Sequence, residues 1–252
     1  MAALICGSLA FDNIMTFEGR FVDQILPDQL HILNVSFLVP TLRRDFGGCA
    51  GNIAYSLKLL GGDAHPMAMV GSDGADYVQR FKELGIETRH VGQLQSTHTA
   101  QCMIMTDHDN NQITAFHPGA MMQAHENRIT ADMAADIKIG IVAPDGRQAM
   151  IEHAAQFKAA GIPFVFDPGQ GLPMFNGQEL LTFVEQASWI AVNDYEAKML
   201  CDRTGLDLAA LSHKVQGLVV TLGAQGCEVW EQGVKTLVAP VQPAAVVDLD
   251  VV

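Results

Sequence analysis

Short apolar segments alternate with longer amphipathic segments through the second half of the chain, and this alternation limits the folds that the chain can adopt. IKIGIVAP and PFVFDP have the composition of buried strands, and RQAMIEHAAQFKAAG between them has the apolar spacing of a helix. A helix between two strands carries the chain back to the starting edge, so the strands run parallel. We therefore expect an α/β fold in which a mostly parallel central sheet has helices on both faces.

Two β-rich segments, 14–45 and 99–117, interrupt this alternation. The first contains IMTFEGRFV and LHILNVSFLV, with Pro27 and Pro40 as breaks, and the second is typical of a hairpin with HDNN as its turn. We expect the two segments to form one small β-sheet lid. The main domain would then comprise residues 1–13, 46–98 and 118–252. Ligands of open α/β sheets bind at the carboxyl ends of the strands, and a lid over that end would cover them.

The composition excludes several classes of partner. The net charge is −13 and no run of Lys or Arg exceeds Arg43–Arg44, so we expect no nucleic-acid partner. No apolar run reaches the ~18 residues of a membrane span, and MAALICGSLAFDNIM lacks the basic region of a signal peptide. The five cysteines are odd in number and far apart, which indicates reduced thiols in the cytoplasm rather than a disulfide or metal cluster.

Sequence motifs of several common enzyme classes are absent. The chain has no G-x-x-x-x-G-K-[ST], no G-x-G-x-x-G after a predicted strand, no H-E-x-x-H and no G-x-S-x-G. These absences disfavour P-loop enzymes, dinucleotide-binding oxidoreductases, zinc peptidases and α/β-hydrolases.

Four polar or glycine-rich stretches remain, all at predicted strand carboxyl ends or helix amino ends. Each also has an ordinary structural explanation: a turn at Asp12, a tight turn at the glycine pair, a capping box at Asn193, and a hairpin turn after Thr221. The stretches hold Ser8 and Asp12; Gly47, Gly48 and Asn52; Asn193 and Glu196; and Thr221, Gly223 and Gly226.

Taken together, the order and spacing of these stretches resemble the ribokinase-like (phosphofructokinase B) family of carbohydrate and nucleoside kinases. FGGCAGNIAYSLKLLGG resembles one of the two signature regions of the family, and the resemblance extends from Ala3 to Asp248. GSDGADYVQRFKELGI, DPGQ, NDYE and VVTLGAQG fall where the family has corresponding segments. The resemblance implies an ATP-dependent phosphotransferase with an alcohol acceptor, built as an α/β domain with a lid.

The resemblance also implies roles for these residues. Ser8, Asp12, Gly47, Gly48 and Asn52 would bind the substrate, because a glycine pair lets backbone amides approach a polyhydroxy ligand. The ATP-binding residues would be Asn193, Thr221, Gly223 and Gly226, with Glu196 holding Mg²⁺ through water. In this family lid sheets often pair between subunits, so a homodimer is a further expectation.

Within the family, GRFVDQILPDQLHILNVSFLV, HTAQCMIMTD, QITAFHPGAM and NDYEAKML most resemble bacterial adenosine kinases. This implies phosphorylation of adenosine to AMP at the ribose hydroxymethyl group, a purine-salvage reaction. Phe116 would stack on the base, unless it is a core residue of the small sheet, and Gln170 would bond the base edge. Cys102 stands where a second aromatic residue would complete a sandwich, which leaves a ribose- or fructose-type sugar kinase as the alternative.

The last residues depart from the family pattern. In the family, a G-A-G-D turn follows VVD and supplies an anion hole and the catalytic aspartate, whereas this sequence reads VVDLDVV to Val252. Asp248 matches the leading aspartate, and we expect no catalytic base after it, since Asp250 has no glycines around it. On this expectation the chain is a truncated or frame-shifted kinase that binds nucleoside and transfers phosphate slowly or not at all.

Overall fold

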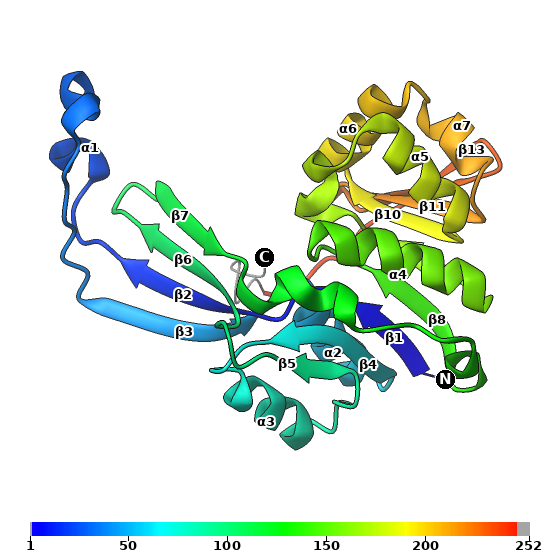
Figure 1. Ribbon diagram of the computed structural model, residues 1–252. Helices are drawn as coiled ribbons and strands as arrows, with labels where there is room; N and C mark the ends of the chain where they lie inside the picture. The colour runs from blue at the N-terminus through cyan, green and yellow to red at the C-terminus, as the bar shows by residue number, and fades with distance from the viewer. Residues whose placement is uncertain (1, 246–252) are drawn as a thin grey trace. The chain divides into compact units, whose positions relative to one another are not determined.

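The computed structural model describes residues 2–245 and forms two compact units, Met1–Ile162 and Pro163–Val252. Figure 1 shows the helices and strands of each unit. Asp248 and Asp250, on which the expectation about the catalytic base depends, lie outside the described residues.

The first unit contains a parallel sheet with the order β8-β1-β4-β5. Its strands are β1 (Ala2–Cys6), β4 (Asp63–Val70), β5 (Val91–Gln93) and β8 (Ile137–Val142). All of β1 is buried, and so is all of β4 after Asp63, as expected of parallel strands covered on both faces. The elements that accompany these strands are α2 (Cys49–Leu59), α3 (Ala75–Glu83), η2 (Gly119–Glu126), η3 (Ala131–Ala135) and α4 (Arg147–Ala160).

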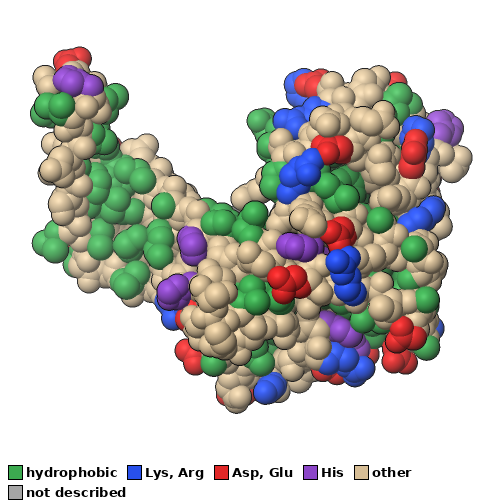
Figure 2. All heavy atoms as spheres, viewed as in Figure 1, with side chains coloured by type: hydrophobic (Ala, Val, Ile, Leu, Met, Phe, Trp, Pro, Cys, Tyr) green, Lys and Arg blue, Asp and Glu red, His purple; other side chains and the backbone are tan. Residues whose placement is uncertain are grey.

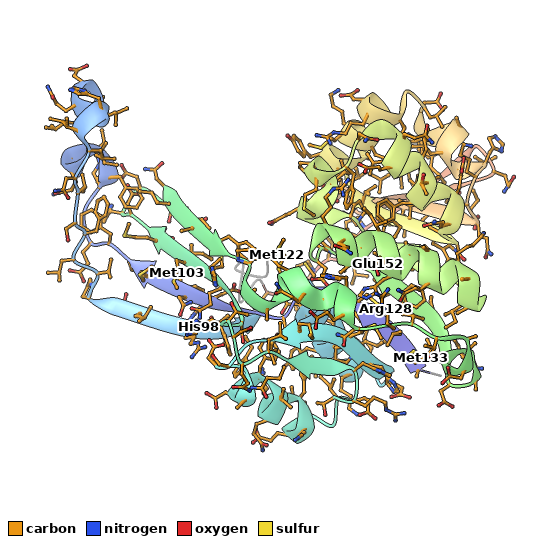
Figure 3. The ribbon with its side chains drawn as sticks, in the orientation of Figure 1. His98, Met103, Met122, Arg128, Met133 and Glu152 are labelled. Atoms are coloured by element: carbon orange, nitrogen blue, oxygen red, sulfur yellow. The ribbon has the colours of Figure 1, made fainter. Side chains whose placement is uncertain are left out.

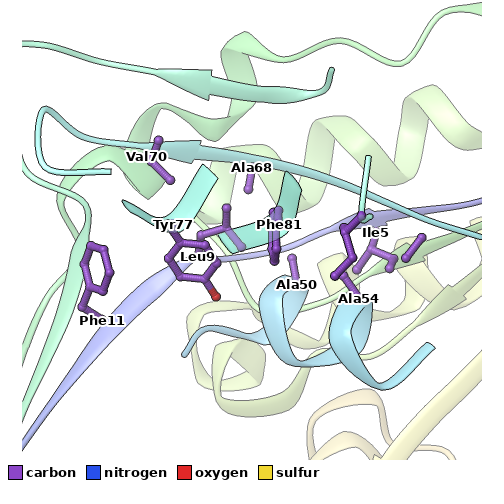
Figure 4. Packing of buried hydrophobic residues seen from close by; sticks show 11 residues of the cluster. Ile5, Leu9, Phe11, Ala50, Ala54, Ala68, Val70, Tyr77 and Phe81 are labelled. Carbon is purple, nitrogen blue, oxygen red and sulfur yellow. The ribbon is translucent and has the colours of Figure 1, made fainter. Parts of the chain in front are cut away.

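Figure 4 shows the core beneath α2 and α3. Ala50 and Ala54 lie one helical turn apart on α2 and are fully buried. Their small side chains let α2 approach the large residues of the same cluster, Leu9, Tyr77 and Phe81. This close approach fixes where α2 begins relative to the strands.

A second, smaller sheet in the same unit has the order β3-β2-β6-β7. It consists of β2 (Ala10–Thr16), β3 (Thr41–Gly47), β6 (Ala100–Thr106) and β7 (Gln112–His117). The predicted separate small sheet is therefore confirmed, and so is the HDNN turn. Asp107 closes that turn by accepting hydrogen bonds from the N–H groups of Asp109 (2.9 Å) and Asn111 (2.8 Å).

Two details differ from the sequence expectation. LHILNVSFLV does not form a strand: η1 (Pro27–Ile32) and an irregular segment precede β3, which begins at Thr41. Ile32 and Leu38 of this stretch are exposed, whereas Phe37 is half-buried and packs against Phe17 and Phe21, so the stretch makes apolar contacts without pairing as a strand. Between β2 and η1 lies the short helix α1 (Phe21–Gln24). In addition, Asp12 lies within β2 of the small sheet, rather than in a turn after the first strand.

The second unit contains a mixed sheet with the order β13-β12-β11-β10-β9. Strands β9 (Phe164–Phe166), β10 (Trp189–Asn193) and β11 (Gly217–Thr221) are parallel, and β12 (Cys227–Glu231) and β13 (Val234–Val238) add an antiparallel hairpin. The helices are η4 (Gly169–Met174), α5 (Gly177–Gln186), α6 (Asp194–Thr204), α7 (Leu208–Ser212) and η5 (Gly223–Gln225).

Within residues 2–245, no helix has both the length and the apolar character needed to cross a membrane. The five cysteines all lie in this described part of the chain and form no disulfide. Only Cys6 is fully buried.

Candidate functional site

Each of the two glycines before α2 lies against a different neighbour that leaves no room for a side chain. Gly48 has φ = 90°, and a Cβ there would lie 2.6 Å from both the carbonyl oxygen of Ser8 and the backbone nitrogen of Ala10. Gly48 cannot cap the helix with a side chain, and Ser8 does so instead. Its hydroxyl accepts from the N–H of Cys49 (3.1 Å) and its carbonyl from that of Ala50 (3.0 Å).

Gly47 makes room for Asp12. A Cβ on Gly47 would overlap the Asp12 carboxylate, which therefore lies directly against the backbone that leads into α2. Partial burial, and then the charge of Asp45, raise the pKa of Asp12. Asn52 is half-buried in the first turn of α2, and its N–H bonds the carbonyl of Gly48 (3.0 Å). The Asp12 carboxylate thus lies against the glycine backbone, and Asn52 follows in the first turn of the helix that this backbone enters.

Asp12 also belongs to a row of side chains that crosses the small sheet. The strand register pairs it with Asp45 on β3 and Cys102 on β6, and pairs Cys102 with Phe116 on β7. Directly paired residues lie on the same face, so the four side chains share it. Asp12 and Phe116 are two strand spacings apart, roughly 10 Å.

Phe116 is not a core residue of the small sheet, because 52% of it is exposed. Other exposed apolar residues on these strands include Met103 and Ile113, and Figure 2 shows apolar side chains gathered over the small sheet. Burial, and then the Asp12 charge, raise the pKa of the Cys102 thiol between Asp12 and Phe116. The row therefore presents a carboxylate, a neutral thiol and an open aromatic ring in sequence.

Asp73 fixes the start of β6, a role that sequence reasoning missed. Its carboxylate accepts hydrogen bonds from the N–H of Thr99 (2.7 Å) and the side chain of Gln101 (3.1 Å). Burial raises the pKa of Asp73, but hydrogen bonds from the backbone and side chain of Thr99, together with the nearby His98, outweigh burial, so the pKa is lowered. Figure 3 shows His98 beside the base of the small sheet, with Met103 further along it. Asp73 thereby ties the small sheet to the loop before α3.

In the second unit, Asn193 and Glu196 form a capping box at the start of α6. Glu196 N–H donates to Asn193 Oδ1, and Asn193 N–H donates to Glu196 Oε2, both at 2.8 Å. Both hydrogen bonds of the capping box predicted from the sequence are therefore formed. The box occupies one oxygen of the Glu196 carboxylate. Asn176 and Glu179 form the same arrangement at the start of α5.

Asp167, which sequence reasoning also missed, is a second carboxylate near Glu196. Burial, and then the Glu196 charge, raise the pKa of Asp167 to about 6. A divalent cation beside Asp167 would offset the repulsion that the Glu196 charge exerts on its ionised form. Among residues 2–245 no group of three or more His, Cys, Asp or Glu side chains is placed to hold a metal, so Mg²⁺ here would need phosphate and water ligands as well.

Thr221, Gly223 and Gly226 surround the turn from β11 to β12. The turn is closed by the N–H of Leu222, which donates to the carbonyl of Gly226 (2.8 Å). Beside it lies a cavity of about 300 Å³, lined in part by Ala197, Val220 and Leu222. Gln170 belongs to the same unit, where it is exposed in η4.

A larger cavity of about 660 Å³ lies elsewhere in the first unit. Asp63, His65, Lys82 and Arg89 are among its lining residues. Asp63 begins β4, so this cavity is at the opposite end of the strand from the glycine pair and is not part of the site.

Asp145 is a third acidic residue that sequence reasoning missed. It follows β8, is 2% exposed, and accepts a hydrogen bond from the N–H of Gly146 (2.8 Å) through Oδ1. Its Oδ2 has no hydrogen-bond partner. Burial raises the pKa of Asp145 to about 8, so the carboxyl is protonated at neutral pH. The preceding Pro144 accepts from the N–H of Ser8 (3.0 Å), which places Asp145 near the start of the site.

Comparison with known proteins gives matches over almost the whole chain. A family model described as pfkB family carbohydrate kinase matches residues 13–249. A structure of a Burkholderia thailandensis nucleoside kinase in complex with inosine is 52% identical with a TM-score of 0.84, covering 98% of this chain and 78% of that one. Its complex with ADP-inosine is 54% identical with a TM-score of 0.81, covering 98% and 77%. A nucleoside kinase from Methanocaldococcus jannaschii is 28% identical over 218 residues, or 85% of this chain and 70% of that protein.

Proposed function

This chain belongs to the pfkB family of carbohydrate kinases, as its sequence predicted, and we propose that it is a nucleoside kinase. In this proposal it transfers the γ-phosphoryl group of ATP to the hydroxymethyl group of the ribose of a purine nucleoside. A bond forms between the hydroxymethyl oxygen and the γ-phosphorus. The bond between the γ-phosphorus and the oxygen that stays on ADP breaks, and the proton of the hydroxymethyl group is released to water. Catalysis of this kind depends chiefly on positioning and on neutralising phosphate charge.

The cross-strand row of Asp12, Cys102 and Phe116 carries the proposal. Asp12 and Asn52 would bond the ribose hydroxyls, with Ser8 and the Gly47–Gly48 backbone at the same end. Phe116, two strands away and open to solvent, would stack on the base. A free sugar would reach the Asp12 end of the row and leave the Phe116 end unused.

A more specific part of the proposal is which purine base the nucleoside substrate carries. Resemblance to adenosine kinases favours adenosine, and the Burkholderia thailandensis relative is described in complex with inosine. We take both nucleosides as candidate acceptors, with Gln170 contacting the base edge.

The second unit would bind the phosphate donor. Asn193, Thr221, Gly223 and Gly226 are the proposed ATP-binding residues, and Asp167 and Glu196 would hold Mg²⁺ together with the phosphates. When bound, Mg²⁺ would neutralise charge on the phosphates during transfer.

A titration of the chain with adenosine, inosine, ribose and fructose tests the acceptor. We expect purine nucleosides to bind and free sugars to bind far more weakly, and Phe116→Ala to weaken nucleoside binding by about 1–3 kcal/mol. Ile113→Ala is the control, since Ile113 lies on the other face of β7. If ribose or fructose binds and neither nucleoside does, the protein is a sugar kinase instead. Nucleoside-dependent ADP formation then separates a kinase from a nucleoside-binding protein without catalysis.

A further inference from the structure

Tyr77 is a buried phenol behind the candidate site, and none of the steps above uses it. It lies on α3 and is 1% exposed. Its ring centroid is 5.6 Å from that of Phe11 on β2, 5.1 Å from that of Phe46 on β3 and 5.1 Å from that of Phe81. Figure 4 shows Tyr77 inside this cluster. Packing on several sides holds the ring in one position.

The hydroxyl of Tyr77 reaches out of the aromatic cluster to the backbone of the glycine pair. It donates a hydrogen bond of 2.5 Å to the carbonyl oxygen of Gly47. It also occupies the space where a Cβ of Gly51 would lie, so it touches the first turn of α2. Burial, and then the charge of Asp12, raise the pKa of the phenol, which therefore keeps its proton and remains a donor.

This bond determines the orientation of the peptide between Gly47 and Gly48. The peptide is planar and trans, so its carbonyl and N–H point in opposite directions. With the carbonyl of Gly47 directed at Tyr77, the N–H of Gly48 points away from it. Neither glycine has a side chain that could hold this orientation, and without an anchor the peptide would have unusual rotational freedom.

We propose that Tyr77 is a positioning residue for the nucleoside: its hydroxyl fixes the Gly47–Gly48 peptide and the first turn of α2, and so the places of Asp12 and Asn52. The inference rests on the proposed function, because it requires that the nucleoside bind beside the glycine pair. Tyr77 itself does not touch the substrate in this arrangement. It acts through the backbone that does.

Calorimetry on the full chain with Tyr77→Phe tests the inference, since this variant keeps the ring and removes only the donor. We expect the dissociation constant for inosine or adenosine to rise about fivefold to tenfold and that for ATP to change by less than about twofold. Tyr55→Phe is the matched control. Tyr55 is on α2 but is 39% exposed, and its hydroxyl should be dispensable for both ligands. A purely structural role for Tyr77 would lower the melting temperature and leave the nucleoside affinity of the folded protein unchanged.

Substitution of Gly51, alone and together with Tyr77, tests the contact between the Tyr77 hydroxyl and α2. Gly51→Ala places a methyl group against the Tyr77 hydroxyl and should weaken nucleoside binding. Adding Tyr77→Phe removes the clashing oxygen, so the double variant should bind more tightly than additivity of the two single changes predicts. Additive effects would contradict the proposed contact.

The wild-type titration separates the two proposals. If the wild type binds nucleoside and Tyr77→Phe binds it equally well, the inference about Tyr77 is wrong and the proposed function stands. If the wild type binds neither inosine nor adenosine, both are wrong.

Discussion

Asp145 shows how a single buried residue should couple stability to pH. Its pKa in the folded protein is about 8, whereas an unfolded aspartate titrates near ~3.9. The folded protein therefore retains a proton that the unfolded chain releases, and stability falls as the pH rises from about 4 to about 8. Asp145→Asn removes this loss, because the amide is neutral at every pH.

We predict that Asp145→Asn stabilises the protein by up to roughly 5 kcal/mol at pH 8, since each unit of pKa difference is worth about 1.4 kcal/mol, and changes its stability little at pH 4. Urea unfolding at pH 4, 6 and 8 measures the difference. Asp28→Asn, at an exposed aspartate in η1, is the control and should leave the free energy of unfolding unchanged across this range. Parallel pH profiles for the wild type and Asp145→Asn would contradict the assignment.

The sequence identified residues whose type and local position are unusual by themselves. It missed residues whose roles depend on contacts with residues far away in the chain. The glycine pair could be identified because two successive glycines before a helix are unusual, and Asp12 because it follows the first predicted strand at the spacing that resembles the family. Tyr77, Asp73 and Asp145 could not be. Tyr77 resembles any core aromatic residue until its hydroxyl meets the carbonyl of Gly47, thirty positions away. The binding roles of Asp12 and of the ATP residues stay predictions.

At the scale of elements, α5 and α6 provide a comparison inside one molecule. Both begin with an asparagine–glutamate capping box, at Asn176–Glu179 and Asn193–Glu196. Removing either cap should cost about 1 kcal/mol of stability. Only Asn193 has a proposed ligand as well.

We predict that Asn176→Ala and Asn193→Ala lower the free energy of unfolding by similar amounts, about 1 kcal/mol each, and that only Asn193→Ala weakens ATP binding. Chemical denaturation and an ATP titration of both variants check this. Equal ATP affinity in the two variants would leave Asn193 with a structural role alone.

The elements that the sequence predicted well have a regular spacing of apolar residues and a recognisable residue where the element ends. The strand–helix alternation after residue 137 predicted parallel strands that the structure confirms in both units. The stretch LHILNVSFLV was wrong as a strand because β-rich composition does not by itself supply a partner strand. The position of Asp12 within β2 depended on pairing with β3 and β6, which no local pattern reveals.

At the scale of the whole molecule, the proposed ligands divide between the two units. Except for Gln170, the nucleoside residues lie in Met1–Ile162, and the ATP residues lie in Pro163–Val252. We predict that nucleoside alone slows hydrogen exchange at β2 and the start of α2, and that ATP alone slows it at the β11–η5 turn. A nucleoside at 100-fold its dissociation constant should also add about 2.7 kcal/mol to the free energy of unfolding. Protection by nucleoside confined to residues 217–226 would contradict this division.

The glycines at the start of α2 have a consequence for the gene. Every glycine codon begins with two guanines, so any single-base change that replaces glycine introduces a side chain or a stop. At Gly47, Gly48 and Gly51 that side chain would meet Asp12, the backbone of Ser8 and the Tyr77 hydroxyl respectively. Gly217, where the nearest atom to an added Cβ is 3.4 Å away, has room for alanine. A base change that replaces glycine at any of the three codons therefore alters the site, and restoring function then requires either reversion or a second change in the neighbouring residue.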